Sequence, residues 1–176
     1  MIIHTVGHGT LPQDTFTALL RGAGITEVVD IRSFPGSRRN PQFGTAEMAR
    51  WLPEAAIGYG WMRSLGGRRR PVSGSRHVAL RNSSFQAYAD YMETDAFRSG
   101  VDELLARGDG RGVMCSESVW WRCHRRLLAD HLVLIQGVDV VHLMHDGRRT
   151  PHPPTEGVRA DGTRLIYDGG ATQRDG

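Results

Sequence analysis

Short apolar runs alternate with amphipathic helical segments along this 176-residue chain, and the alternation predicts an α/β fold. The fold class that we expect is a three-layer sandwich with a mainly parallel central sheet, Rossmann-like or flavodoxin-like. Four strands are indicated most clearly, at 2–6, 26–31, 113–115 and 138–143. The length is sufficient for one core, so residues 1–145 are expected to form a single α/β domain, with 146–176 as a partly irregular C-terminal extension.

The first strand, 2–6, leads into a helix whose start is marked by Thr10 and Gln13. This pair resembles a capping box, Pro12 suits the first turn, and Gly24 ends the helix.

The second strand, 26–31, is followed by a loop at 32–41 that proline and glycine mark. A helix that Thr45 is expected to cap comes next, and then a short strand near 58–62.

A long basic stretch follows. Residues 55–89 contain no acidic residue but carry six arginines: Arg63, Arg68, Arg69, Arg70, Arg76 and Arg81. We expect 64–78 to be a mobile basic loop. It suits a grip on the phosphate backbone of a nucleic acid, with Trp61 or Tyr59 near a base, or equally a loop that closes over a small anionic ligand.

The second half of the chain continues the alternation. Its expected elements are helices at 84–92 and 94–106, a central strand at 113–115, a helix at 123–136, a strand at 138–143 and a weak strand at 165–167. Gly137 ends the helix that begins at Cys123.

Composition limits the class of protein. All 22 basic residues are arginine and the net charge is +3, which favours an anionic ligand but also fits a general compositional bias. No apolar run approaches the ~20 residues of a membrane span and no signal peptide opens the chain, so no membrane partner is expected. Two cysteines do not make a disulfide scaffold, which favours a reducing, cytoplasmic setting.

Polar side chains gather where the predicted strands end. His8 follows the first strand, Asp30 and Arg32 end the second, and His142 or His145 lies at the last. Ligands of parallel α/β sheets bind beyond the carboxyl ends of the strands, so we expect one cleft there. Asp30 and Arg32 are two residues apart and therefore point to the same side, either as an anion site or as a structural ion pair.

The stretch VMCSESVWWRCHRR, residues 113–126, concentrates reactive residue types at a strand end and a helix start. Cys123 opens the helix beside His124 and Arg125, a position that favours a thiolate. Cys115 is either a ligand contact or a small core residue, and Glu117 is either a general acid–base group or an ion-pair partner. Trp120 and Trp121 suit stacking on a ring or plain packing. The cysteine spacing does not suit zinc, so no metal is expected.

Seven short motifs occur one after another along the chain. They are TVGHG at 5–9, VVDIRSFPGSRRNPQFG at 28–44, LGG at 65–67, FQAYADYM at 85–92, CSE at 115–117, CHR at 123–125 and VVHL at 140–143. The ordered set resembles the domain-of-unknown-function family 488. The resemblance implies that the Asp-x-Arg, Ser-Arg, Cys-x-Glu and Cys-His-Arg elements form the functional core, and it implies no reaction.

Three functions remain open. The first is an enzyme that acts on a phosphate-bearing ligand, either a nucleotide or a nucleic acid. In it Arg32, Arg38 and Arg125 hold the anion, with His8 and Cys115 as further ligand contacts, and Asp30, Glu117 or His124 transfer protons. The second is a redox or sulfur-transfer enzyme with Cys123 as nucleophile. The third is a non-catalytic nucleic-acid-binding module. The sequence leaves cofactor and oligomeric state undetermined.

Overall fold

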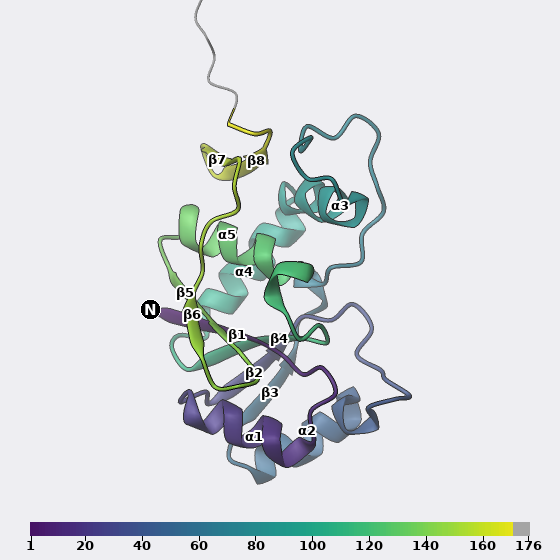
Figure 1. The fold of residues 1–176 in the computed structure, drawn as a ribbon, viewed down its shortest axis with the longest axis vertical. Coiled ribbons are helices and arrows are strands. Elements are labelled where there is room, and N and C mark those ends of the chain that lie inside the picture. Colours follow the sequence, from purple (N-terminus) through teal and green to yellow (C-terminus); the bar gives the residue numbers. More distant parts are fainter. Residues whose placement is uncertain (171–176) are drawn as a thin grey trace, which may run out of the picture.

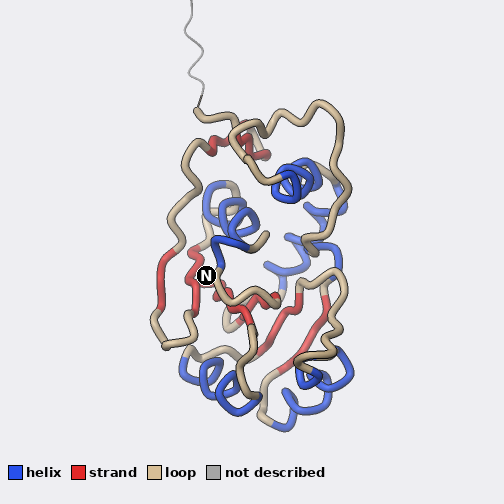
Figure 2. The backbone as a smooth tube through the Cα atoms, turned by 45° about the vertical axis from the view of Figure 1, so that its right-hand side comes forward, coloured by secondary structure: helices blue, strands red, loops and turns tan. Residues whose placement is uncertain are grey.

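The structure, a computed structural model that describes residues 1–170, has a central six-stranded sheet between two layers of helices (Figures 1 and 2). In chain order the main elements are β1 (Ile2–Gly7), α1 (Gln13–Gly22), β2 (Glu27–Asp30), α2 (Thr45–Glu54), β3 (Gly58–Trp61), α3 (Ser83–Met92), α4 (Asp95–Ala106), β4 (Arg111–Cys115), α5 (Arg125–Leu134), β5 (Asp139–Leu143), β6 (Arg149–Pro151), β7 (Val158–Asp161) and β8 (Arg164–Tyr167). Short 3-10 helices lie at Pro41–Phe43, Arg63–Leu65 and Trp120–Arg122. The predicted three-layer α/β sandwich is confirmed.

The strand order β3-β2-β4-β1-β5-β6 creates a switch point in the middle of the sheet. β1 to β5 are parallel and β6 is antiparallel to β5. The chain leaves β1 through α1 toward the β3 edge, whereas it leaves the adjacent β4 through α5 toward the β6 edge. The loops after β1 and β4 therefore diverge to opposite faces, and such a divergence opens a crevice at the carboxyl edge of an α/β sheet.

Two apolar cores lie on the two faces of the sheet. Helices α1 and α2 cover one face and α3, α4 and α5 the other (Figure 1). The alternation along β4 assigns its residues to these cores: Met114 packs toward α1 and α2, whereas Val113 and Cys115 pack toward α3, α4 and α5. Cys115 therefore ends β4 on the face that α5 covers.

Most predicted elements begin and end within two residues of the observed ones, but two predicted caps are wrong. Helix α1 begins at Gln13 with Pro12 at its N-cap and no side-chain cap, so the capping box of Thr10 and Gln13 is not formed. Thr45 is the first residue of α2 rather than its cap, and its hydroxyl donates to the Pro35 carbonyl. Helix α5 begins at Arg125, two residues later than expected.

The basic segment at 64–78 is held at several points along its length. Leu65 and His77 are buried. Arg69 donates to the Gly66 carbonyl at 2.9 Å and its guanidinium stacks on Tyr91. Arg76 pairs with Glu93 at 2.8 Å. Two of the four arginines of this segment, Arg69 and Arg76, are thus held by contacts with the protein itself.

The C-terminal part adds structure that the sequence indicated only at 165–167. β6 extends the sheet, and β7 and β8 form a hairpin whose residues Leu165 to Tyr167 are buried beside α3 and α5 (Figure 1). Within the part of the chain that the structure describes, no helix has the length and apolar character needed to cross a bilayer.

Candidate functional site

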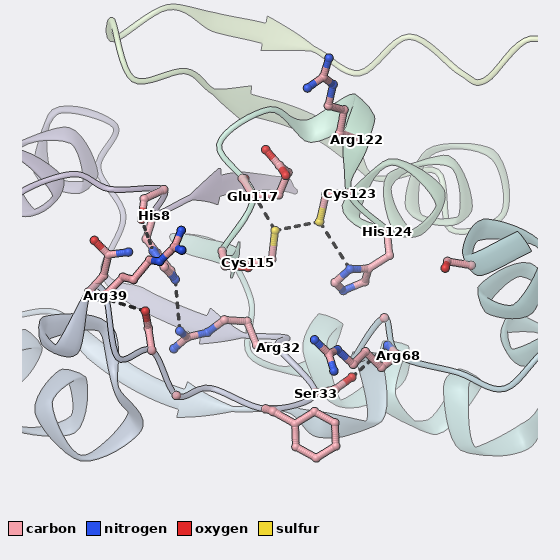
Figure 3. A pocket seen from close by; sticks show the side chains of 18 of the residues that line it. His8, Arg32, Ser33, Arg39, Arg68, Cys115, Glu117, Arg122, Cys123 and His124 are labelled. Atoms are coloured by element: carbon pink, nitrogen blue, oxygen red, sulfur yellow. Dashed lines mark hydrogen bonds between the residues drawn. The ribbon is translucent and has the colours of Figure 1, made fainter. Parts of the chain in front are cut away.

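A cavity of about 630 Å³ opens at the carboxyl edge of the sheet, at the switch point between β1 and β4 (Figure 3). Six of the predicted site residues line it: His8, Arg32, Cys115, Glu117, Cys123 and His124. Three others do not: Asp30, Arg38 and Arg125. In their place the walls carry Arg39, Arg68 and Arg122; of these, only Arg68 was indicated by the sequence, as part of the basic stretch at 55–89.

Asp30 ends β2 behind the cavity wall and holds Arg32 in a two-pronged ion pair. Arg32 Nε donates to Asp30 Oδ1 at 2.9 Å and Arg32 Nη2 donates to Oδ2 at 2.6 Å. The Asp30 carboxylate also accepts from the Arg32 amide at 3.0 Å and from the Tyr59 hydroxyl at 2.8 Å. Four donors occupy this fully buried carboxylate, so its geometry suits positioning of Arg32 rather than proton transfer.

His8 ends the β1 side of the cavity as a neutral imidazole with both nitrogens engaged. Its Nδ1 donates to the Gly9 carbonyl at 2.8 Å, and its Nε2 accepts from Arg32 Nη1 at 3.2 Å. Burial lowers the pKa of His8 to about 4, and the ring stacks on Phe43 at 4.2 Å. His8 therefore orients Arg32 and forms a wall of the cavity.

The two cysteines meet at the floor of the cavity, with their Sγ atoms 2.7 Å apart and both thiols free (Figure 3). Cys115 reaches this point from the end of β4, and Cys123 from the loop that enters α5. The first backbone amide of α5, that of Arg125, donates to Cys123 Sγ at 3.5 Å, and His124 Nδ1 lies 3.4 Å from the same sulfur.

These surroundings shift the pKa values of the two thiols in opposite directions. Burial raises the pKa of Cys115 well above its usual range. Burial also opposes ionisation of Cys123, but the hydrogen bond from Cys115 and the neighbouring His124 and Arg125 outweigh it and hold the pKa of Cys123 well below its usual range. Cys123 is therefore the more acidic thiol of the pair, and Cys115 is the one that holds its proton more strongly.

Arg125, predicted as an anion ligand, lies beneath the two thiols and does not line the cavity. Its side chain is 1% exposed and donates to the Thr5 hydroxyl at 3.3 Å and to the Glu117 carbonyl at 2.5 Å. Within residues 1–170 no carboxylate forms an ion pair with Arg125. A buried guanidinium without a carboxylate needs a nearby negative charge, and the Cys123 thiolate supplies one.

The rim of the cavity is strongly cationic. Arg39, Arg68 and Arg122 line it, and none of them has an ion-pair partner in the described part of the chain. Glu117 is the one acidic residue among the lining side chains, and it is exposed at the rim. Arg38, predicted as an anion ligand, is adjacent to Arg39 but does not line the cavity.

The family model described as Domain of unknown function DUF488 matches residues 12–132. The chain belongs to the DUF488 family. The match confirms the resemblance on a shorter stretch than expected, because the TVGHG and VVHL motifs lie outside it. Comparison with curated proteins and with solved structures gives no match.

A buried polar chain connects this DUF488 core to residues beyond the matched stretch. Thr5 Oγ1 lies 2.6 Å from His142 Nδ1, His142 Nε2 lies 2.9 Å from His152 Nδ1, and His152 Nε2 lies 2.8 Å from Asp130 Oδ1. The Tyr167 hydroxyl donates to the other Asp130 oxygen at 2.9 Å. Asp130, His142 and Tyr167 are each fully buried.

The hydrogen bonds of this buried polar chain all run in one direction, which is set by the groups at its two ends. Arg125 can only donate, so the Thr5 oxygen accepts from it and the Thr5 hydroxyl proton points to His142 Nδ1. Burial lowers the pKa of His142 to about 3, so its ring is neutral and its Nε2 carries the proton that is donated to His152. The chain thus runs from the buried cation Arg125 to the buried anion Asp130.

Sequence reasoning placed His142 or His145 at the ligand edge, but neither lines the cavity of this DUF488 domain. His142 stacks on Trp120 at 4.2 Å, and His145 Nε2 lies 2.6 Å from the Gly7 carbonyl. Within residues 1–170 no group of three or more histidine, cysteine, aspartate or glutamate side chains is arranged to hold a metal ion.

Proposed function

We propose that this DUF488 domain is an enzyme that binds a small phosphate-bearing ligand at the carboxyl edge of its sheet and acts on it with Cys123 as nucleophile. The observation that carries the proposal is the position of Cys123, which lies at the start of α5, over the unpaired cation Arg125 and on the floor of a cavity whose rim is lined by arginines. A thiolate is the reactive form of cysteine, and a positive environment of this kind stabilises it.

The rim supports an anionic ligand rather than a neutral one. Three arginines without ion-pair partners among the described residues line one cavity, and each has the planar fork that matches two phosphate oxygens. The volume of about 630 Å³ lies within the range of small-molecule sites. Phe34 and Phe85 add apolar wall against which a ring could pack, so a nucleotide is the ligand class that the lining suits.

Most side chains that could transfer protons are already hydrogen-bonded within the protein, which favours nucleophilic catalysis over acid–base catalysis. Asp30 and His8 have their acceptor positions occupied within the protein. His124 contacts Cys123 Sγ through Nδ1, and its Nε2 has no hydrogen-bond partner among the described residues. In the proposed reaction Cys123 attacks the ligand, His124 acts on the Cys123 sulfur through Nδ1, and Glu117 at the rim exchanges protons with the leaving group.

The test compares a neutral and an anionic alkylating agent. Iodoacetamide should modify Cys123 with a half-maximal rate at a pH well below the ~8.5 of a free thiol, because the folded site stabilises the thiolate. Iodoacetate should gain relative to iodoacetamide, and combined alanine substitution of Arg39, Arg68 and Arg122 should reduce that gain by about tenfold or more. Arg38→Ala, one position from Arg39 but outside the cavity, is the matched control.

Nucleoside monophosphates complete the test. They should protect Cys123 from iodoacetamide in the wild-type protein and lose that protection in the triple arginine variant. Labelling that follows the pH profile of a free thiol, together with no preference for iodoacetate, would overturn the proposal. Protection that is equal in the wild type and in the triple variant would remove the arginines from the ligand site.

A nucleic-acid ligand is the second candidate, and one observation favours it. Phe34 is 64% exposed at the cavity mouth, with the guanidinium groups of Arg63 and Arg68 over its ring at 5.4 and 5.7 Å. Exposed aromatic rings flanked by arginines bind single strands by stacking and phosphate contact. Binding of an oligonucleotide that weakens steeply between two salt concentrations would favour this candidate over a mononucleotide.

A further inference from the structure

Besides the proposed nucleophile, the floor of the cavity carries a second thiol that the proposed function does not use. Cys115 Sγ lies 2.7 Å from Cys123 Sγ, and both residues line the cavity. If the only covalent adduct were a phosphoryl or acyl group on Cys123, the electrophilic atom would be phosphorus or carbon, and a neighbouring thiol would not be needed. A thiol beside the nucleophile is useful when the Cys123 sulfur itself becomes electrophilic, as it does in a mixed disulfide.

We propose that Cys115 and Cys123 form a reversible thiol–disulfide couple whose exchange partner is a small disulfide that carries anionic groups. The proposal rests on the nucleophilic role of Cys123 given above, and it names an anionic disulfide, in place of a nucleotide, as the substrate on which that nucleophile acts. The arginine rim selects for negative charge, and a disulfide with carboxylate or phosphate groups meets that requirement whereas a neutral peroxide does not.

The exchange takes place in two steps. The Cys123 thiolate attacks one sulfur of the bound disulfide; the substrate S–S bond breaks, a mixed disulfide forms on Cys123, and the first substrate thiolate leaves. The departing thiolate takes the proton of Cys115, and the Cys115 sulfur then attacks Cys123 Sγ, which closes the protein disulfide and releases the second thiolate. Two cysteine thiols lose two electrons in total, and the substrate disulfide gains them.

The different surroundings of the two thiols fit these two roles. The attacking sulfur is the one that the α5 amide and His124 contact. The resolving sulfur, Cys115, is 3% exposed and sits behind it on the β4 side. Both cysteines are buried, with 6% exposure for Cys123 and 3% for Cys115, so the contacts of the α5 amide and of His124 with Cys123 Sγ, rather than steric access, direct the first attack to Cys123.

Arg125 adds a thermodynamic consequence. Closing the disulfide removes the thiolate charge, and the buried guanidinium of Arg125 then has no negative partner among residues 1–170. The dithiol form is therefore stabilised relative to the disulfide, so the closed disulfide is easily reduced. Arg125→Met removes the cation and should shift the thiol–disulfide equilibrium toward the disulfide by about tenfold or more, the effect of one opposite charge close to a thiolate.

The first experiment uses 5,5′-dithiobis(2-nitrobenzoate), an anionic disulfide whose released thiolate is coloured. The wild-type protein should release two thiolates per chain, retain no adduct, and lose the mass of two hydrogens. Cys115→Ser and Cys115→Ala should each release one thiolate and keep a stable mixed disulfide, and Cys123→Ser should react slowly. The wild-type stoichiometry tests the proposal even if a Cys115 variant does not fold.

The second experiment tests the substrate class and the role of Arg125. Cystamine, a cationic disulfide, should react more slowly than the anionic reagent, and that difference should shrink in the triple arginine variant. Equilibration with mixtures of reduced and oxidised glutathione, read by mass spectrometry, should show more protein disulfide in Arg125→Met than in the wild type.

The outcomes separate the two proposals. A wild-type protein that stops at a stable mixed disulfide would overturn the resolving role of Cys115 and leave the nucleophile in place. Cys123→Ser that reacts as fast as the wild type would overturn both proposals. Closure of the pair by hydrogen peroxide but not by either disulfide would overturn the substrate class.

Discussion

Replacement of Thr5 by valine tests the buried chain that leads away from the site. Thr5 is 2% exposed, and its hydroxyl links Arg125 Nη1 at 3.3 Å to His142 Nδ1 at 2.6 Å. Valine has nearly the same shape but neither accepts nor donates a hydrogen bond. Thr5→Val therefore leaves one guanidinium N–H and one imidazole nitrogen buried without their partner.

The size of the effect follows from these two groups. Each buried polar group left unsatisfied costs about 1–3 kcal/mol, so Thr5→Val should lower the free energy of unfolding by about 2–6 kcal/mol. Thr5→Ser keeps the hydroxyl and loses one methyl group, which should cost about 1 kcal/mol. Urea denaturation of both variants at neutral pH gives the difference directly. Equal stability of the valine and serine variants would refute the view that the chain from Arg125 to Asp130 contributes to the fold.

Two further predictions concern protonation and the position of His124. Burial lowers the pKa values of five histidines, among them His8 and His131 to about 4 and His142 to about 3. In the unfolded chain imidazoles have a pKa near 6.5, so the stability that the neutral rings contribute is complete above pH 6.5. Below that pH the free energy of unfolding, measured by urea denaturation, should fall by about 1.4 kcal/mol per pH unit for each histidine. His131→Gln should reduce this slope, and an unchanged slope would contradict the assignment. Gly67→Ala places a Cβ against His124 Nδ1 and should move the alkylation midpoint of Cys123 to higher pH, whereas Gly36→Ala, whose Cβ meets open space, should leave it unchanged.

The fold could be predicted because its signals are local. Apolar runs and helical periodicity gave the alternation of elements, and the rule for parallel sheets gave the edge at which a cavity lies. The alternation along β4 also contains the reason that the cysteines meet, since it places Cys115 on the face covered by α5. The family motifs mark the same strand ends and the start of α5.

The parts of the site that were not predicted depend on irregular backbone or on distant contacts. Arg38 and Arg39 are neighbours in a loop without period, so no pattern indicates which of them faces the cavity. Arg125 was expected to face the ligand, but it turns inward because Thr5 and the Glu117 carbonyl accept its protons there. His152 comes from a segment expected to be partly irregular, and its link to Asp130 spans 22 residues of sequence.

The buried charges beneath the cavity bear directly on the ionisation of Cys123. Asp30 neutralises Arg32, and Asp130 accepts from His152, Tyr167 and the Thr155 amide, so neither carboxylate forms an ion pair with Arg125. Between Arg125 and Asp130 the hydrogen-bonded chain runs through neutral groups. Cys123 can carry a negative charge close to this buried cation, and Arg125 adds to the hydrogen bond from Cys115 and to the neighbouring His124 in holding the pKa of Cys123 below its usual range. The site is most reactive when the Cys123 thiolate is free. Alkylation and disulfide closure both consume the thiolate, and each leaves the buried positive charge of Arg125 without its negative partner.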